Sequence, residues 1–190
     1  MMKTTNIMIV GVGGQGSLLA SKLLGNLLVD EGFDVKVSEV HGMSQRGGSV
    51  VTYVRFGDKV YSPIVDKGEA DFIVAFEKIE AARYASYLKE SGKIIVNTQE
   101  IDPMPVITGA AEYPADALGK LSSLGLSVDA LDALSPAEEA GSAKAVNIVL
   151  MGRLSKYMSI PEEKWVEAIK ESAPPKFIDM NIKAFGLGRR

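Results

Sequence analysis

The sequence contains no cysteine, and His41 is its only histidine in 190 residues. Without thiolates the chain can form no disulfide and can ligate no iron–sulfur cluster of its own. A single imidazole also argues against a zinc site, because such sites combine several histidine and cysteine ligands. We therefore expect this chain to hold no metal.

Long hydrophobic runs and a strong charge of one sign are lacking as well. No apolar run approaches the roughly 20 residues of a membrane-spanning helix, and the first stretch, MMKTTNIMIVGVGG, lacks the apolar core of a signal peptide. The formal net charge is only −3, which gives no support for nucleic-acid binding. These absences predict a cytoplasmic protein that has neither nucleic acid nor a membrane as a partner.

The sequence does contain a glycine-rich opening. Residues 6–10 are an apolar, β-branched run typical of a buried parallel strand. A G-x-G-x-x-G pattern with one extra glycine follows, formed by Gly11, Gly13, Gly14 and Gly16. Apolar residues at helical spacing predict a helix from Leu18 to Leu28, Gly32 marks its end, and residues 33–40 alternate as a second strand. The opening is therefore predicted to be a βαβ unit.

The first glycine loop, residues 11–16, has two interpretations. Its backbone amides and the following helix N-terminus can hold an anion, such as the phosphates of a nucleotide. Alternatively, the glycines only allow the strand and the helix to pack closely. Gln15 in this loop and Asn97 at the end of a later strand are expected to face the same crevice, where open α/β sheets bind ligands. Glu39 has the place of a ribose-binding carboxylate, although its spacing from the glycines exceeds the usual ~20 residues. It could equally orient Ser44 or pair with Arg46.

A second loop, HGMSQRGG at residues 41–48, concentrates polar groups and glycines at the same predicted sheet edge. Arg46 offers a rigid donor fork for a carboxylate or phosphate. We interpret the loop as a binding loop rather than a solvated turn with a surface salt bridge, and we expect His41 to be structural rather than catalytic. The predicted binding residues of the two loops are Gly11, Gly13, Gly14, Gln15, Gly16, Ser44, Gln45, Arg46, Gly47 and Gly48.

The rest of the chain alternates strands with helices. Strands are predicted at residues 50–56, 60–65, 71–75, 93–97, 106–107 and 126–133, the first two as a hairpin. Helices are predicted at residues 77–90, 114–124, 135–157 with an interruption at Gly141, 161–172 and 176–185. This alternation predicts an α/β fold. We expect one Rossmann-like, three-layer domain across residues 1–190, with a mostly parallel but mixed sheet.

Motifs of self-sufficient catalysis are missing. The sequence has no G-x-S-x-G and no Walker lysine after the glycines. We therefore assign no catalytic residue. The chain is better suited to bind a ligand or to complete the active site of another chain.

Two segments together resemble one family. GVGGQGSLLASKLL and SEVHGMSQRGGSVVTYVRFGDKVYSP are similar to the gamma subunit or gamma domain of the 2-oxoacid:ferredoxin oxidoreductases, and within them to the small beta subunit of indolepyruvate ferredoxin oxidoreductases. The resemblance extends to VNTQEI, AVNIVLMG and PPKFIDMNIKAFGLG, so it covers nearly the whole chain. The first glycine loop is shared with wider families, whereas its combination with SEVHGMSQRGG is specific.

The resemblance implies an accessory subunit that is inactive alone and binds no cofactor by itself. In that family, thiamine diphosphate and the iron–sulfur clusters belong to the large alpha subunit, which decarboxylates the 2-oxoacid and reduces ferredoxin. That subunit would be the direct partner and ferredoxin an indirect one. Coenzyme A is a co-substrate, and the Gly11–Gly16 and Ser44–Gly48 loops would face its pocket. Whether the isolated chain forms a homodimer stays open.

The residues alone also allow an alternative function. A stand-alone NAD(P)- or flavin-binding oxidoreductase would use the same glycine loop, with Glu39 on the ribose. The two hypotheses differ in whether the chain binds a dinucleotide on its own.

Overall fold

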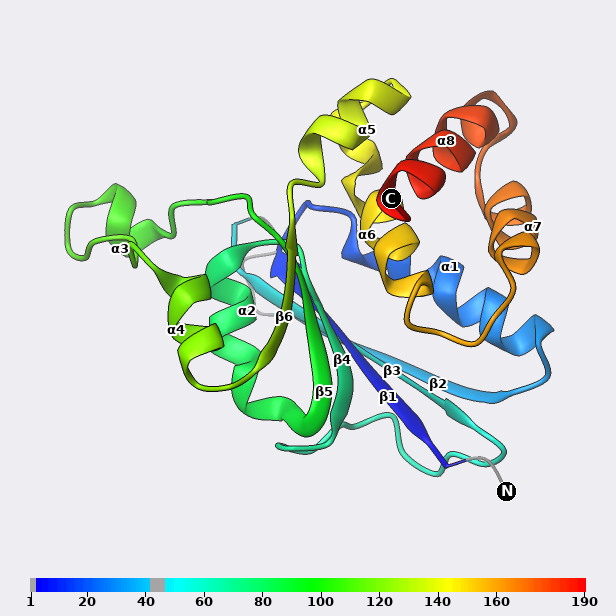
Figure 1. Cartoon of the computed structure of the whole chain (residues 1–190), viewed down its shortest axis with the longest axis horizontal. Helices are drawn as coiled ribbons and strands as arrows, with labels where there is room; N and C mark the ends of the chain where they lie inside the picture. The colour runs from blue at the N-terminus through cyan, green and yellow to red at the C-terminus, as the bar shows by residue number, and fades with distance from the viewer. Residues whose placement is uncertain (1–2, 42–46) are drawn as a thin grey trace.

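The computed structural model describes residues 3–41 and 47–190. Across these residues one six-stranded sheet has the order β2-β3-β1-β4-β5-β6 (Figure 1). The strands are β1 (Thr5–Val12), β2 (Asp34–His41), β3 (Ser49–Gly57), β4 (Ala70–Ala75), β5 (Leu88–Asn97) and β6 (Ser127–Leu131). β1, β4, β5 and β6 pair in parallel, whereas β3 runs antiparallel to both β1 and β2. The prediction of an α/β, Rossmann-like fold with a mostly parallel, mixed sheet is confirmed.

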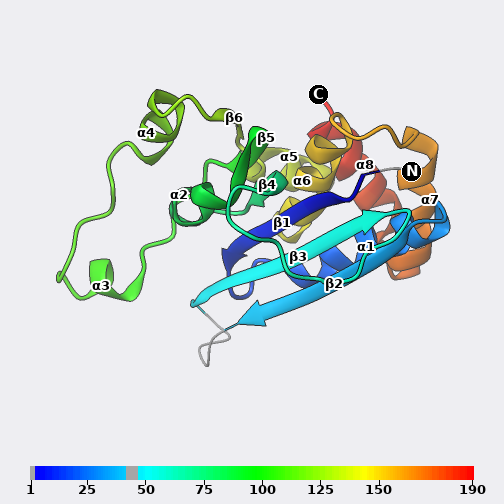
Figure 2. The same cartoon turned by 90° about the horizontal axis from the view of Figure 1, so that it is seen from below.

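Helices lie on both sides of the sheet. α1, α6, α7 and α8 lie on one side, and α2 and α4 on the other (Figure 1, Figure 2). The helices are α1 (Ser17–Asp30), α2 (Lys78–Tyr84), α3 (Met104–Ile107), α4 (Ala117–Ser123), α5 (Leu134–Ala140), α6 (Val146–Ser155), α7 (Glu162–Ser172) and α8 (Ile178–Gly188). Short 3-10 turns are η1 (Ala85–Tyr87), η2 (Ala143–Ala145) and η3 (Pro175–Phe177). Among the residues described, no helix combines the length and the apolar character needed to cross a membrane.

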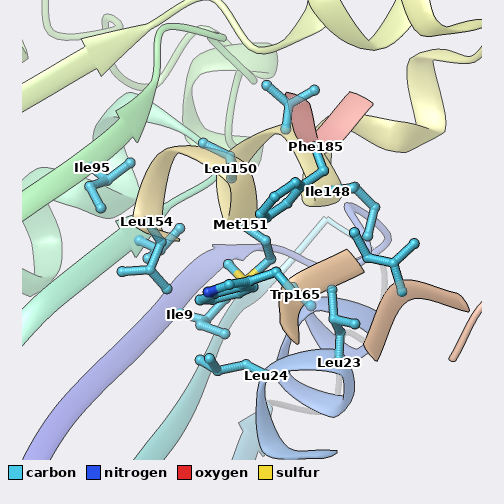
Figure 3. Close-up of a cluster of buried hydrophobic side chains, with 14 of the residues drawn as sticks. Ile9, Leu23, Leu24, Ile95, Ile148, Leu150, Met151, Leu154, Trp165 and Phe185 are labelled. Carbon is cyan, nitrogen blue, oxygen red and sulfur yellow. The ribbon is translucent and has the colours of Figure 1, made fainter. Parts of the chain in front are cut away.

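The alternation of side chains along β1 divides the interior into two hydrophobic clusters. Ile7 and Ile9 belong to the larger cluster, which they share with α1, α6, α7 and α8. Figure 3 shows side chains of this cluster converging between the helices and the sheet. Met8 and Val10 point to the other side and belong to the smaller cluster, which includes residues of α2 and α4. The fully apolar run of β1 follows from this burial on both faces.

α6 and α8 pack with their backbones in direct contact. A Cβ atom at Gly152 would overlap the carbonyl oxygen of Phe185, and one at Gly188 would overlap that of Val149. Glycine at these two positions therefore sets the separation of the two helices.

The predicted hairpin between residues 50–56 and 60–65 is wrong. Residues 50–56 lie in β3, but β3 pairs with β1 on one side and β2 on the other, so neither edge accepts another strand. Residues 60–65 form an irregular segment instead. Its carbonyl oxygens at Ser62 and Ile64 accept hydrogen bonds of 2.9 and 2.6 Å from the Arg55 guanidinium.

Two further predictions about local structure are wrong. The helix predicted at residues 77–90 ends at Tyr84, because Leu88 already pairs with Ala70 as the first residue of β5. The strand predicted at residues 106–107 lies in the single-turn helix α3. A smaller difference concerns α5, which begins at Leu134, one residue before the predicted start. The side chain of Asp132 caps this helix by accepting hydrogen bonds from the amides of its first two residues.

Candidate functional site

The parallel strands β1, β4, β5 and β6 end at one edge of the sheet, and the candidate site is built there. The first glycine loop leaves β1, Phe76 follows β4, and Asn97 is the last residue of β5. This is the edge at which open α/β sheets bind ligands. The predicted neighbours Gln15 and Asn97 meet here, because the side-chain amides of both donate to the carbonyl oxygen of Phe76, each at 3.2 Å.

Gln15 closes the first glycine loop from inside. Its Oε1 accepts a hydrogen bond from the Val12 amide at 2.7 Å, while its Nε2 donates to Phe76 and, at 3.4 Å, to Gln99 Oε1. A Cβ atom at Gly11 would lie 2.8 Å from Gln15 Oε1, so only glycine leaves room for this side chain. The loop is thus tied to the ends of β4 and β5 by a carboxamide rather than left open.

The turn into α1 depends on two glycines in the left-handed region. Gly14 has φ +103° and Gly16, the N-cap of α1, has φ +88°. A Cβ at Gly16 would lie 3.1 Å from Asn147 Nδ2, which donates a 3.4 Å hydrogen bond to the Gly16 carbonyl. The amides of Gly14 and Gly16 donate no hydrogen bond to any described residue. They stand at the positive end of the α1 dipole, which suits an anion.

The second loop meets the first at its described end. Gly13 donates a 2.9 Å hydrogen bond to the Gly48 carbonyl, and Gly47 donates one of 3.4 Å back to Gly13. Ser44, Gln45 and Arg46 lie outside the described residues. Their binding role stays a prediction, as does that of the glycines.

Two buried carboxylates beside the site were not predicted. Glu77 is only 1% exposed and caps α2 by accepting from the amides of Ile79 and Glu80. Its second oxygen accepts from Ile101 N and from the Tyr113 hydroxyl. Burial and this carboxylate raise the pKa of Tyr113, so its hydroxyl remains a proton donor.

The second buried carboxylate, Glu80, accepts from the Ser49 hydroxyl at the start of β3 and from Arg83. Glu77 could have been found from the sequence, because it is an acidic residue directly between a buried strand and a helix. Asn147 and Gln99 stand in no sequence pattern that would have identified them.

Glu39 is not placed like the ribose carboxylate of a dinucleotide fold. β1 and β2 run parallel and are joined through α1, as predicted, but β3 lies between them. Two strand spacings of roughly 4.8 Å therefore separate β2 from β1. Glu39 is exposed on the edge strand. The arrangement gives the stand-alone dinucleotide-binding hypothesis no support.

Within residues 3–41 and 47–190, no three His, Asp or Glu side chains gather in a way that could hold a metal ion. The polar groups of the described site are backbone amides and the carboxamides of Gln15, Asn97, Gln99 and Asn147. These are neutral groups that bind and orient a ligand, and none of them is a nucleophile or an acid–base catalyst.

The comparisons with known proteins agree along almost the whole chain. The model of the family "Pyruvate ferredoxin/flavodoxin oxidoreductase" matches residues 6–190. The indolepyruvate oxidoreductase subunit IorB of Thermococcus kodakarensis is 48% identical over 98% of this chain and 95% of its own length.

Two solved structures share the fold. The pyruvate oxidoreductase subunit PORC of Thermotoga maritima has a TM-score of 0.73 at 20% identity, covering 98% of this chain and 95% of that one. The 2-oxoglutarate:ferredoxin oxidoreductase of Magnetococcus marinus has a TM-score of 0.75 at 19% identity. There the match covers 98% of this chain but only 30% of that chain, so the same fold also occurs within a much longer polypeptide.

Proposed function

This chain belongs to the pyruvate ferredoxin/flavodoxin oxidoreductase family, and we propose that it is the gamma-type accessory subunit of an indolepyruvate or arylpyruvate:ferredoxin oxidoreductase. Family membership makes it a subunit of a 2-oxoacid:ferredoxin oxidoreductase complex, and the substrate, the co-substrate and the partner are the parts that we propose. The observation that carries the proposal is the 48% identity, along 98% of this chain, to an indolepyruvate oxidoreductase subunit.

The proposed division of labour follows from what this chain has to offer. It has no thiolate, and its described residues form no metal-binding cluster. In the proposal, thiamine diphosphate and the iron–sulfur clusters therefore belong to a large alpha subunit. The complex converts an arylpyruvate, coenzyme A and two oxidised ferredoxins into an aryl-acetyl-CoA, CO2, two reduced ferredoxins and a proton, and this chain catalyses none of it alone.

The proposed contribution of this chain is one wall of the coenzyme A pocket. The amides of Gly14 and Gly16 and the N-terminus of α1 suit a phosphate or a carboxylate. The hydrogen bonds of Gly13 with the second loop bring both predicted loops to one place. The proposed ligand-facing residues remain Gly11, Gly13, Gly14, Gln15, Gly16, Ser44, Gln45, Arg46, Gly47 and Gly48.

Exposed apolar side chains at the same edge support a covering partner. Leu18, in the first turn of α1, is 57% exposed, and Val40, near the end of β2, is 48% exposed. Exposed apolar surface of this kind is a feature of protein interfaces. We also propose a single domain over residues 1–190 and a cytoplasmic location. The lack of cysteine fits this location, because cytoplasmic proteins rarely contain disulfides.

Reconstitution tests this function. The tagged chain is purified with and without a co-expressed large subunit, and viologen reduction is measured with indolepyruvate and coenzyme A. We expect a brown complex that reduces viologen, whereas either subunit alone does not. A colourless chain that never associates, or a large subunit that is fully active alone, contradicts the proposal.

Arg46 tests the pocket within the assembled complex. We expect Arg46→Ala to raise the KM for coenzyme A or for the oxoacid, because a phosphate or carboxylate loses its bidentate partner. Arg190→Ala is the control, because it removes a guanidinium at the C-terminus of the chain. We expect it to leave both KM values unchanged. If Arg46→Ala has the kinetics of the wild type, Arg46 has no role in binding.

A further inference from the structure

A long arm leaves the body of the protein between β5 and α4. We define the arm as residues 98–116, which include α3. Figure 1 and Figure 2 both show α3 standing away from the sheet and from the helices. Its tip exposes two large apolar side chains, Met104 at 66% and Ile107 at 65%.

The arm is held at its base by hydrogen bonds and an ion pair. The buried carboxylate of Glu77 accepts hydrogen bonds from the amide of Ile101, near the start of the arm, and from the hydroxyl of Tyr113, near its end. Lys78 and Glu100 add an ion pair of 2.7 Å. A segment fixed at both ends loses little further entropy when its tip docks, and this favours binding.

The arm carries charge of one sign only. Its carboxylates are Glu100, Asp102, Glu112 and Asp116, and it contains no lysine or arginine. Glu100 is paired with Lys78, whereas Asp102 and Glu112 are exposed and form no ion pair with any described residue. The arm therefore offers two carboxylates in addition to its apolar tip.

A groove of complementary character lies between α1 and α8. We define the α1–α8 groove as the hollow of about 370 Å³ bordered by these helices with α6, α7 and η3. Its apolar lining includes Leu19, Leu23, Ile148, Ile169, Phe177 and Met180. Lys22 and Lys144 also line it, and no carboxylate does among the described residues. Neither lysine forms an ion pair within the described part of the chain.

The arm does not reach the groove of its own chain. In both views α3 lies at one end of the molecule, and α1, α7 and α8 lie towards the other (Figure 1, Figure 2). Hydrogen bonds to Glu77, the N-cap of α2, hold the base of the arm at this end of the molecule. A contact between the two surfaces therefore requires two molecules.

We propose that the arm of one copy docks into the α1–α8 groove of a second copy, and that the second arm docks reciprocally. Met104 and Ile107 fill the apolar groove, while Asp102 and Glu112 meet Lys22 and Lys144. Such a two-fold arrangement uses one pair of surfaces twice and closes into a dimer. The charges fix the orientation of the docked arm, and the apolar side chains supply most of the affinity. This inference does not depend on the proposed function.

Sedimentation velocity tests the dimer. At 50 µM we expect the isolated wild-type chain to sediment with twice the 20.3 kDa mass of one chain. The groove variant Lys22→Glu/Lys144→Glu and the tip variant Ile107→Glu are each expected to weaken the dimer at least tenfold. Lys67→Glu reverses one lysine charge and Leu124→Glu adds the same charge as the tip variant, both at exposed positions outside the two surfaces, and they are expected to leave the dimer unchanged. Circular dichroism checks that every variant is folded.

Exchanging the charges of the arm and the groove distinguishes this contact from any other way of forming a dimer. The arm variant Asp102→Lys/Glu112→Lys and the groove variant are each expected to be monomeric alone. Mixed in equal amounts they form a heterodimer, because each arm then faces a groove of opposite charge. A wild-type chain that stays monomeric at 50 µM, or a dimer that the charge reversals leave intact, overturns the proposal. The proposal is also overturned if the wild-type chain is monomeric and its arm variants no longer bind the large subunit, because the arm then contacts that subunit.

Discussion

The contact between α6 and α8 makes a strong prediction about stability. Gly152 lies in the middle of α6, and a Cβ there would overlap the Phe185 carbonyl oxygen and lie 3.1 Å from its carbonyl carbon and 3.3 Å from Gly188 Cα. All three are backbone atoms, so no side-chain rotation can relieve the overlap. Gly152→Ala must therefore push the two helices apart.

The magnitude follows from two opposing effects. Overpacking costs about 1–3 kcal/mol, and the rigid surroundings place this substitution near the upper end. Alanine is about 1 kcal/mol better than glycine inside a helix. The net loss is about 2 kcal/mol, which lowers the Tm by roughly 4–8 °C for a chain of this length.

Gly186→Ala is the matched control, because it lies in α8 with no atom within 4 Å of the added Cβ. It gains the helix propensity without the overlap, so we expect its Tm to rise by roughly 2–4 °C. Differential scanning calorimetry of both variants measures the difference. If Gly152→Ala is as stable as Gly186→Ala, the two backbones are not in contact and the reasoning fails.

Three further predictions concern single side chains. Gln15→Ala leaves the Val12 amide without its acceptor and should lower the free energy of unfolding by about 1–3 kcal/mol, measured in urea. Tyr113→Phe releases one end of the arm from Glu77, so amide hydrogen exchange should become faster in residues 101–116. Tyr61→Phe is the control and should leave exchange in the arm unchanged, because the Tyr61 side chain is 89% exposed. Burial alone would raise the pKa of Asp129, but hydrogen bonds and charge from Arg153, together with the Tyr157 hydroxyl, lower it overall. Its stabilisation is therefore present above the unfolded pKa of about 3.9 and is lost as the pH falls below it. Asp129→Asn should then cost stability at pH 7 and progressively less below pH 4, and an equal loss at both pH values would contradict this assignment.

The parts of the fold that the sequence predicted correctly are those whose burial dictates a pattern. The apolar run of β1 and the helical spacing of α1 reflect packing on the sheet, and both elements form where expected. The helix predicted at 77–90 fails because pairing with β4 overrides helix periodicity. A Cβ at Gly92 would lie 2.7 Å from the Ala70 carbonyl oxygen, a closeness that belongs to strand pairing. Local pattern contains no information about such a neighbour.

The candidate site shows the same limit. Gln15 and Asn97 were predicted together because each follows a strand that ends at one sheet edge. Asn147 was not, because it lies on α6 and reaches Gly16 across 131 residues of sequence. A buried carboxamide in a helix has no periodicity of its own, so only the fold reveals its partner.

The position of β3 distinguishes this glycine-rich opening from that of a dinucleotide fold. In a dinucleotide fold the strand after the first helix lies directly beside β1, so its terminal carboxylate and the glycine loop contact one ligand. Here β3 occupies that place, and the residues that precede it, Gly47 and Gly48, hydrogen-bond to Gly13. Gln15 fills the inside of the loop and binds the end of β4. The α1 dipole and the amides of Gly14 and Gly16 therefore suit an anion, but Glu39 is not placed to contact the same ligand. Such a loop suits a ligand whose remaining contacts come from another subunit.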